Sequence, residues 1–521
     1  MRHALLILLL LGPGWALADG LSAPQKALHV LDRLAYGPRS GELERVTAMG
    51  AEAYIDEQLA PEKIVPPPQL RAQLDALDSL RLGPAELFRR YGPPARRAAG
   101  DDPAARKQVQ QAANRVAEQA MQARLLRAVY SPAQLQEVMT DFWFNHFNVF
   151  RGKGLEERIW LAAYERDAIR PYALSRFRQL LGATARHPAM LYYLDNWQST
   201  VPRTDRFGDS KGGLNENYAR ELMELHTLGV DGGYTQKDVT ELARILTGWT
   251  YLPRDWMEGG NAPFAFEPKR HDFGDKTLLG MRFDGSGEAE GERALDLLAR
   301  SPATAHHLSW QLAQYFVADE PPPALVERMT KRYLQSDGDI REVLRTLFHS
   351  PEFWSAGYTG NKFKTPYQYV VSALRASGVE VRNFRPALSA LNQLGMPLYG
   401  CQTPDGWKNT EAAWLNPDAM VYRLNFATAL GAGRLPLLRP EATLPVPDDE
   451  PPAPRPMNAS INAAPAEAEF GDDDRPPPPD PDLLQDTLGH PFSAQTVAAL
   501  DAARPRLRAA LMLGSPEFMR H

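Results

Sequence analysis

Cysteine is almost absent from this chain, because Cys401 is the only one among its 521 residues. A single cysteine excludes an intramolecular disulfide, so the packed core must stabilise the fold without covalent cross-links. Cys401 also lies between Gly400 and Pro404, in a turn-rich stretch with no histidine close by. This setting argues against a catalytic thiol.

A strong excess of charge of either sign is also lacking. The formal net charge is −6, and the 58 basic and 64 acidic side chains are mixed along the sequence. Binding to nucleic acid or to an anionic membrane surface needs a concentrated basic patch, so we predict neither partner. A composition with 44% hydrophobic and 23% charged residues is that of an ordinary globular protein.

Long hydrophobic runs are missing after the first residues. The segment 1–18, MRHALLILLLLGPGWALA, has a basic start, a leucine-rich centre and an A-x-A ending at Ala16 and Ala18. Its apolar run is too short for a bilayer span and is interrupted by Gly12 and Pro13. We predict a signal peptide cut after Ala18, a periplasmic or secreted protein, and no membrane span after signal removal.

Two common signatures of hydrolases are absent as well. The chain has no G-x-S-x-G nucleophile elbow, and no second histidine stands four residues from His226, as the helical zinc motif requires. The sequence therefore leaves open whether the protein is an enzyme.

Helical periodicity dominates what the chain does contain. We predict a mainly α fold with a large helical domain over residues 19–435, whose core motif is 215–249, and one short extended or hairpin excursion within 261–283. Residues 436–491 include PDDEPPAPRP and DDDRPPPPDPD, which cannot bury enough apolar surface to fold. We predict a disordered insertion there, followed by C-terminal helices over 492–521 that pack back on the main domain.

The core motif reads NENYARELMELHTLGVDGGYTQKDVTELARILTGW and predicts two helices joined by a tight turn. Asn215 is suited to cap the first helix, and Gly229 is suited to end it. Thr235 and Asp238 have the spacing of a capping box that opens the second helix. This motif organises the rest of the prediction.

The first helix of the motif has two chemical faces. Asn217, Glu221 and Glu224 recur at i, i+4 and i+7 and form a polar stripe, whereas His226 falls within the apolar arc. The stripe is either a solvated face or one wall of a site. His226 is either a core imidazole bonded to a carbonyl or a ligand.

A second group of polar residues follows Ser131 and Pro132, which predict a helix start. Asn145 belongs to a polar line on an aromatic-rich helix, and His146 occupies a core-facing position. This pattern is typical of a buried structural network with other side chains, and the alternative is a site.

Further polar candidates stand at the ends of predicted elements. Asp195 and Asn196 end an apolar helix, His271 and Asp272 lie at the turn of the extended excursion, and Trp407 lies in a loop rich in Pro and Gly. Each position is also typical of a chain that simply returns to the surface.

The motif resembles the hallmark of the bacterial family called domain of unknown function 1800. WFNHFNVF, HDFGDKTLLG, TPDGW and LMLGSPEFMR resemble the other landmarks of that family, in the same order. The resemblance implies an exported, mostly helical bacterial protein of uncharacterised activity. It also implies a possible partner, an exported protein similar to sulfatases and alkaline phosphatases. It implies no catalytic residues.

Two functions follow from these observations. The first is a helical binding or assembly protein of the cell envelope that acts with another exported protein. The alternative is a metal-assisted exported hydrolase with a divalent metal as cofactor. In the alternative, Glu221 and Glu224 are catalytic and the metal ligands are His146, His226, His271 and Asp272. The predicted ligand-binding residues are Asn145, Asp195, Asn196, Asn217 and Trp407.

Overall fold

The structure is a computed structural model, and it describes residues 20–204, 210–438, 474–489 and 492–521. Helices make up 61% of it, which confirms the prediction of a mainly α fold. Strands within the described ranges form only three two-stranded antiparallel sheets. Helix-on-helix packing therefore builds the core.

Helices follow one another through most of the part of the chain that the structure describes. In order they are α1 Ala23–Leu34, α2 Glu42–Met49, α3 Ala51–Gln58, α4 Pro68–Asp75, α5 Pro84–Tyr91, α6 Pro93–Ala98, α7 Pro103–Tyr130, α8 Gln134–His146, α9 Leu155–Tyr164, α10 Phe177–Arg186, α11 Pro188–Tyr193, α12 Glu216–Glu224, α13 Gln236–Ile245, α14 Pro253–Met257, α15 Glu288–Ala299, α16 Pro302–Phe316, α17 Pro323–Gln335, α18 Ile340–Phe348, α19 Pro366–Ala376, α20 Arg385–Gln393, α21 Glu411–Trp414, α22 Pro417–Gly431, α23 Pro481–Leu488, α24 Ala494–Ala502 and α25 Pro505–Leu513.

The strands are short and lie in the middle third of the chain. β1 Arg203–Thr204 pairs with β2 Ser210–Lys211, β3 Trp249–Thr250 pairs with β4 Ala265–Phe266, and β5 Lys276–Leu278 pairs with β6 Met281–Phe283. The last two sheets confirm the extended excursion that the sequence predicts within 261–283.

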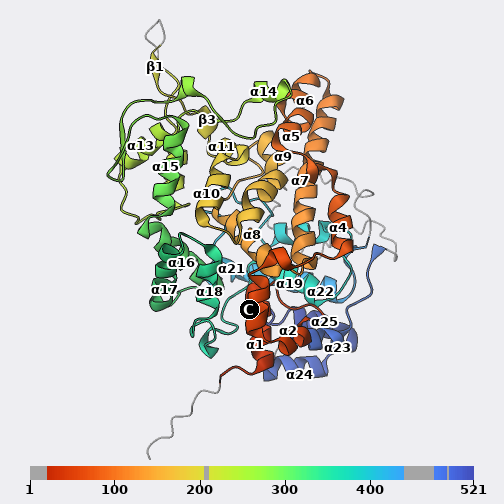
Figure 1. Ribbon diagram of the computed structural model, residues 1–521. Coiled ribbons are helices and arrows are strands. Elements are labelled where there is room, and N and C mark those ends of the chain that lie inside the picture. The colour runs from red at the N-terminus through yellow and green to blue at the C-terminus, as the bar shows by residue number, and fades with distance from the viewer. Residues whose placement is uncertain (1–19, 205–209, 439–473, 490–491) are drawn as a thin grey trace, which may run out of the picture.

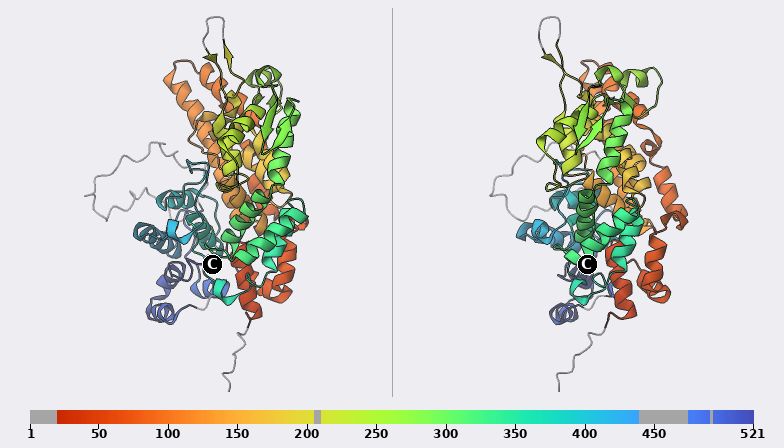
Figure 2. Two further views of the ribbon diagram at one scale, coloured as in Figure 1. Left: turned by 90° about the vertical axis from the view of Figure 1, so that its left-hand side faces the viewer. Right: turned by 60° about the vertical axis from the view of Figure 1, so that its left-hand side comes forward.

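The body is elongated, with α8 near its centre (Figures 1 and 2). Helices α13 and α15 lie toward one end, and α1 to α3 lie with α22 to α25 at the other (Figure 1). The last residue pairs with the middle of the chain, since the backbone N–H of His521 donates to the carbonyl of Lys362 over 2.9 Å. Segments distant in sequence thus meet at both ends of the body.

Aromatic side chains fill the interior around the centre. Trp143, Trp160, Trp249 and Trp256 are fully buried. The indole N–H of Trp143 donates to the carbonyl of Ala173 over 2.9 Å, which satisfies its only polar atom. Such rings contribute a large apolar area and fix the neighbouring helices rigidly.

Helix α8 begins later than predicted. It starts at Gln134 instead of at Pro132. The Ser131 hydroxyl accepts from the N–H of Ala133, and the Gln134 amide donates to the carbonyl of Ser131 over 2.7 Å. These local hydrogen bonds satisfy the polar groups of a turn that precedes the helix. Ser131 therefore caps this turn and not α8.

Helix α12 ends earlier than predicted. It stops at Glu224, and the N–H of His226 donates to the carbonyl of Glu221 over 3.0 Å, one residue wider than the helical pattern. His226 is buried, as its apolar surroundings in sequence predict, but it lies in the turn that follows the helix.

Part of the predicted disordered insertion is helical. Within 436–491, α23 begins after Asp480, whose carboxylate accepts from the N–H of Asp482 over 2.9 Å, and it buries Leu484 and Leu488. A capped start and two core-facing leucines outweigh the proline-rich composition of this stretch. Residues 439–473 and 490–491 of the predicted insertion lie outside the described residues, as does the predicted signal peptide.

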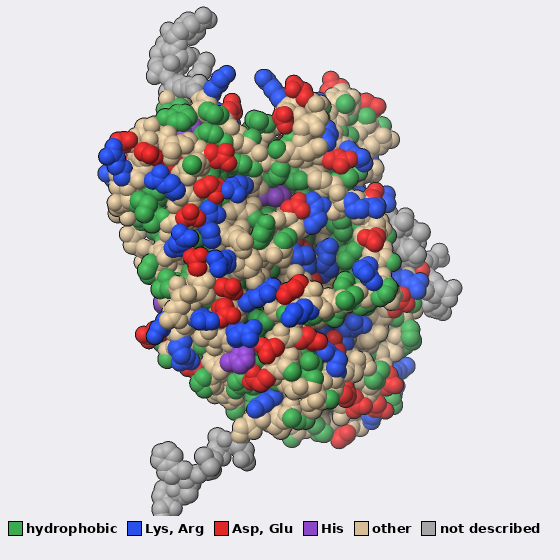
Figure 3. Space-filling view, in the orientation of Figure 1, with side chains coloured by type: hydrophobic (Ala, Val, Ile, Leu, Met, Phe, Trp, Pro, Cys, Tyr) green, Lys and Arg blue, Asp and Glu red, His purple; other side chains and the backbone are tan. Residues whose placement is uncertain are grey.

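Charged side chains of both signs are mixed over the face shown in Figure 3, as the sequence predicts. In the part of the chain that the structure describes, no helix is both long and apolar enough to cross a bilayer.

Candidate functional site

The core motif folds into a helical pair that is capped as predicted. The Asn215 side chain accepts from the N–H of Tyr218 over 3.0 Å and donates to the carbonyl of Leu194 over 2.8 Å. Thr235 and Asp238 form the reciprocal capping box of α13. The first cap therefore also ties α12 to the end of α11.

The loop that contains TPDGW is fastened to the end of α8. The Asn145 amide donates to the carbonyl of Trp407 over 2.8 Å, and the N–H of Trp407 donates back to the Asn145 side chain over 2.7 Å. At Gly406, where φ is +67°, a Cβ would lie 2.3 Å from the carbonyl of Asn145. Only glycine permits this approach. Asn145 and Trp407, which were both predicted to bind a ligand, therefore hold the TPDGW loop against the end of α8.

Asn148 strengthens the same connection. Its amide donates to the carbonyls of Cys401 and Thr403 over 3.0 and 2.9 Å. The landmarks WFNHFNVF and TPDGW, which are about 260 residues apart, therefore form one structural unit.

His146 and His226 meet beneath this unit. Nε2 of His146 lies 3.2 Å from the carbonyl oxygen of His226, and the two ring centroids are 6.0 Å apart. Burial lowers the pKa of His146 to about 3 and that of His226 well below its ordinary value. Both imidazoles are neutral at physiological pH and belong to the core.

The two predicted catalytic glutamates differ in their surroundings. Glu224 accepts a hydrogen bond from the Tyr234 hydroxyl over 3.0 Å. Glu221 is half-buried, and its pKa is raised by burial and by the neighbouring carboxylate of Glu224. The pKa of Glu221 is thus shifted in the direction that acid–base chemistry requires.

The remaining predicted ligand-binding residues bond to the protein or face water. Asp195 pairs with Lys153 over 2.7 Å. The Asn196 amide donates to the carbonyls of Leu246 and Trp249 over 3.3 and 3.1 Å. Asn217 is exposed. The structure does not bring these three side chains to one cavity with Asn145 and Trp407.

His271 and Asp272 take part in a different contact. Nε2 of His271 lies 2.7 Å from Glu290, and Lys276 lies 2.5 Å from the same carboxylate oxygen, with all three side chains fully buried. Asp272 pairs with Arg244 over 2.7 Å. These residues anchor the HDFGDKTLLG segment to α15 and α13.

The four predicted metal ligands thus occupy two separate environments. Among the described residues, no group of three or more His, Cys, Asp or Glu side chains has an arrangement that could hold a metal ion. The divalent metal stays a prediction without support from this geometry.

The sequence reasoning missed a buried charge network beside Asn145. Arg124 on α7 pairs with Asp141 on α8 and reaches Glu165 over 3.5 Å, and Arg170 contacts Glu165 over 3.1 Å. The pKa of Asp141 is raised by burial, although Arg124 opposes that shift. Arg124 stands in an Ala- and Arg-rich stretch, and its composition gave no signal of a buried role.

A small cavity lies between this network and the TPDGW loop. Its volume is about 30 Å³, and its lining includes Arg124, Asp141, Asn145 and Trp407. Such a space accommodates about one water molecule, so it is too small for an organic substrate.

Comparison with known proteins gives one family. Residues 29–520 match the family described as "Protein of unknown function (DUF1800)". Neither a curated protein nor a solved structure matches the sequence. The match spans nearly the whole chain and confirms the resemblance stated from its motifs. The chain belongs to the DUF1800 family of proteins of unknown function.

Proposed function

We propose that this chain is a helical binding or assembly protein of the cell envelope that acts with a second exported protein. The predicted signal peptide supports the location, and an exposed apolar face on α22 and α25 supports the activity. Asn145, Asn196, His271 and Asp272 are engaged in holding the fold together. We therefore regard the apolar face as the more suitable surface for recognition.

The apolar face spans two helices that touch along their length. Leu424 on α22 lies beside Gly514 at the end of α25, and Gly431 on α22 lies beside Ala510. Val421 and Leu424 are three residues apart and share one side of α22, and Leu507 and Leu511 are four apart and share one side of α25. The exposed fractions of these four apolar side chains lie between 39% and 56%.

Such a face has a thermodynamic reason to be covered. Burial of apolar surface contributes about 25 cal/mol for each Å² removed from water. Soluble monomers seldom expose large apolar side chains together, and where they do the patch marks a contact with another molecule. The face therefore favours a protein partner with an apolar surface of its own.

The proposed partner is an exported protein similar to sulfatases and alkaline phosphatases. Titration calorimetry of the mature chain against such a protein, taken from the same bacterium, tests the proposal. Leu424→Asp should weaken association at least about tenfold, because a carboxylate would be buried in the interface. Leu334→Asp is the matched control, since Leu334 on α17 is exposed to 44% and Leu424 to 46%.

Equal affinity of the wild type and both variants would contradict the assignment of the face. Absence of any association between the two wild-type proteins would contradict the partner. Circular dichroism of each variant checks that the fold is retained.

A metal-assisted hydrolase is the second candidate, and the raised pKa of Glu221 favours it. If that function holds, the purified mature chain contains close to one equivalent of a divalent metal, and Glu221→Ala keeps the metal but loses activity. Elemental analysis without bound metal in either protein would count against it.

A further inference from the structure

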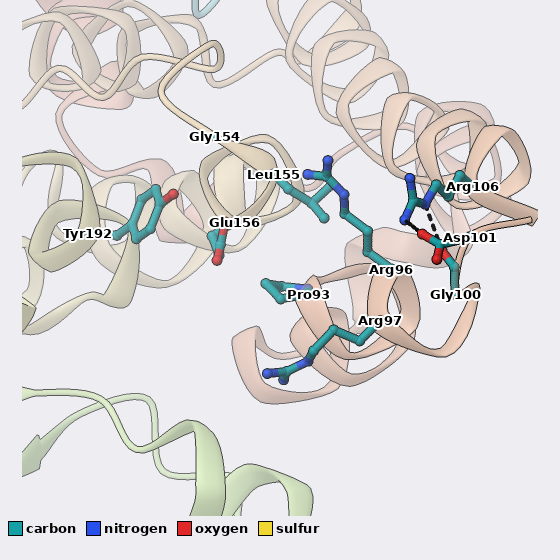
Figure 4. Close-up of a pocket in the computed structure, with 10 residues that line it drawn as sticks. All are labelled: Pro93, Arg96, Arg97, Gly100, Asp101, Arg106, Gly154, Leu155, Glu156 and Tyr192. Atoms are coloured by element: carbon teal, nitrogen blue, oxygen red, sulfur yellow. Dashed lines mark hydrogen bonds and ion pairs between the residues drawn. The ribbon is translucent and has the colours of Figure 1, made fainter. Parts of the chain in front are cut away.

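A further cavity lies away from the family motifs. It has a volume of about 600 Å³ and opens between α6, the start of α7, the first residues of α9 and the end of α11 (Figure 4). This volume is within the range of cavities that bind small organic molecules.

Arg96 and Arg97 of α6 line this cavity. Figure 4 shows Arg96 reaching toward Leu155, whereas Arg97 extends past Pro93 and away from Leu155. Neither guanidinium has a hydrogen-bond or ion-pair partner among the described residues, whereas Arg106 on the far side pairs with Asp101 over 2.6 Å. The lining has three arginines against the two carboxylates of Asp101 and Glu156, so the cavity carries a net positive charge.

The wall opposite α6 is aromatic and rigid. The Tyr192 ring stacks on Trp197, with centroids 6.2 Å apart, and packs edge-on against Trp160 at 6.0 Å. At Gly154 a Cβ would lie 2.4 Å from the Tyr192 hydroxyl oxygen, so the absence of a side chain lets this ring lie against the start of α9. The ring is therefore held in place before a ligand arrives.

Acceptor and apolar groups complete the lining. Glu156 presents a half-buried carboxylate, which accepts hydrogen bonds from hydroxyl groups. Pro93 and Leu155 add apolar surface. Guanidiniums bind phosphate oxygens bidentately, and an aromatic face with an adjacent carboxylate suits a sugar ring.

We propose that the cavity between α6 and α9 binds a sugar that carries a phosphate group. Arg96 and Arg97 hold the phosphate, Glu156 accepts from ring hydroxyls, and the Tyr192 ring contacts the face of the sugar. This site is separate from the apolar face of α22 and α25, and its occupancy does not depend on the protein partner.

Calorimetry of the mature chain with glucose 6-phosphate, glucose and inorganic phosphate as probes tests this site. Glucose 6-phosphate should bind at least about tenfold more tightly than glucose or inorganic phosphate. Arg96→Gln and Arg97→Gln should each weaken its binding about tenfold, because each loses a charge-assisted contact. Arg506→Gln on α25 is the control, since it changes an exposed arginine of another helix.

The proposal is overturned if glucose 6-phosphate does not bind, or if it binds no more tightly than inorganic phosphate. It is also overturned if Arg96→Gln and Arg97→Gln both bind glucose 6-phosphate as the wild type does. Co-sedimentation with phosphatidylglycerol vesicles tests whether the site binds the phosphate of a lipid headgroup instead of a soluble sugar phosphate. Retention on vesicles without binding of glucose 6-phosphate would also overturn it.

Discussion

Of the polar contacts that join separate segments of this molecule, two show a clear contrast, because one is neutral and the other is charged. Asn145 and Trp407 exchange two neutral hydrogen bonds, whereas Lys276 and His271 share the carboxylate of Glu290 in a fully buried cluster. The amide contact satisfies its own donors and acceptors. The buried carboxylate depends on its partners, because an ion left alone in the interior is strongly unfavourable. The charged contact should therefore be the more sensitive to a single substitution.

Loss of Lys276 should have the largest effect. Lys276→Met leaves Glu290 without its ammonium partner and should lower the free energy of unfolding by about 3–5 kcal/mol. Urea unfolding followed by circular dichroism measures the change.

The double variant Lys276→Met/Glu290→Leu sharpens this test. It removes both charges together, so it should recover most of the lost stability. A double variant as unstable as Lys276→Met would show that packing, and not the charge left behind, determines the loss.

The neutral contact should give a smaller change. Asn145→Ala leaves the N–H of Trp407 and its carbonyl without partners and should cost about 1–3 kcal/mol in the same unfolding experiment. Asn217→Ala is the control, because Asn217 is exposed and should change stability by less than about 0.5 kcal/mol. A loss for Asn145→Ala larger than that for Lys276→Met would reverse the comparison.

The free energy of unfolding should also depend on pH through His146, which is buried near Asn145. Folding lowers the pKa of His146 to about 3 from an ordinary value of 6.5, so between these values the unfolded chain binds more protons. Stability then falls as the pH falls, by about 1.4 kcal/mol for this residue between pH 7.5 and pH 5.5. His146→Gln should reduce the pH dependence of the unfolding free energy by that amount. An unchanged pH dependence would contradict this, because His146 would then bind its proton equally well in the folded and unfolded chains.

Local signals made the helical pair predictable. Asn215 caps α12, and Thr235 with Asp238 caps α13, because a cap is formed by residues within three positions of one another. The burial of His146 and His226 followed equally from their apolar neighbours.

Contacts between distant segments were not predictable in this way. Arg124, Asp141 and Glu165 come from separate helices, and nothing in their local pattern indicates that they meet. Glu290, which contacts His271, lies on a different element further along the chain, so the local pattern around His271 does not indicate this buried charge cluster. A single sequence defines faces of helices, but the partner of each face depends on how the helices pack.

The most direct test of the account compares Glu221→Gln with Leu424→Asp in calorimetric titration against the exported partner protein. The account predicts that Glu221→Gln binds like the wild type, while Leu424→Asp loses at least about tenfold in affinity. Loss of binding in Glu221→Gln together with full binding in Leu424→Asp would contradict it, because recognition would then lie in the family motif and not on the apolar face.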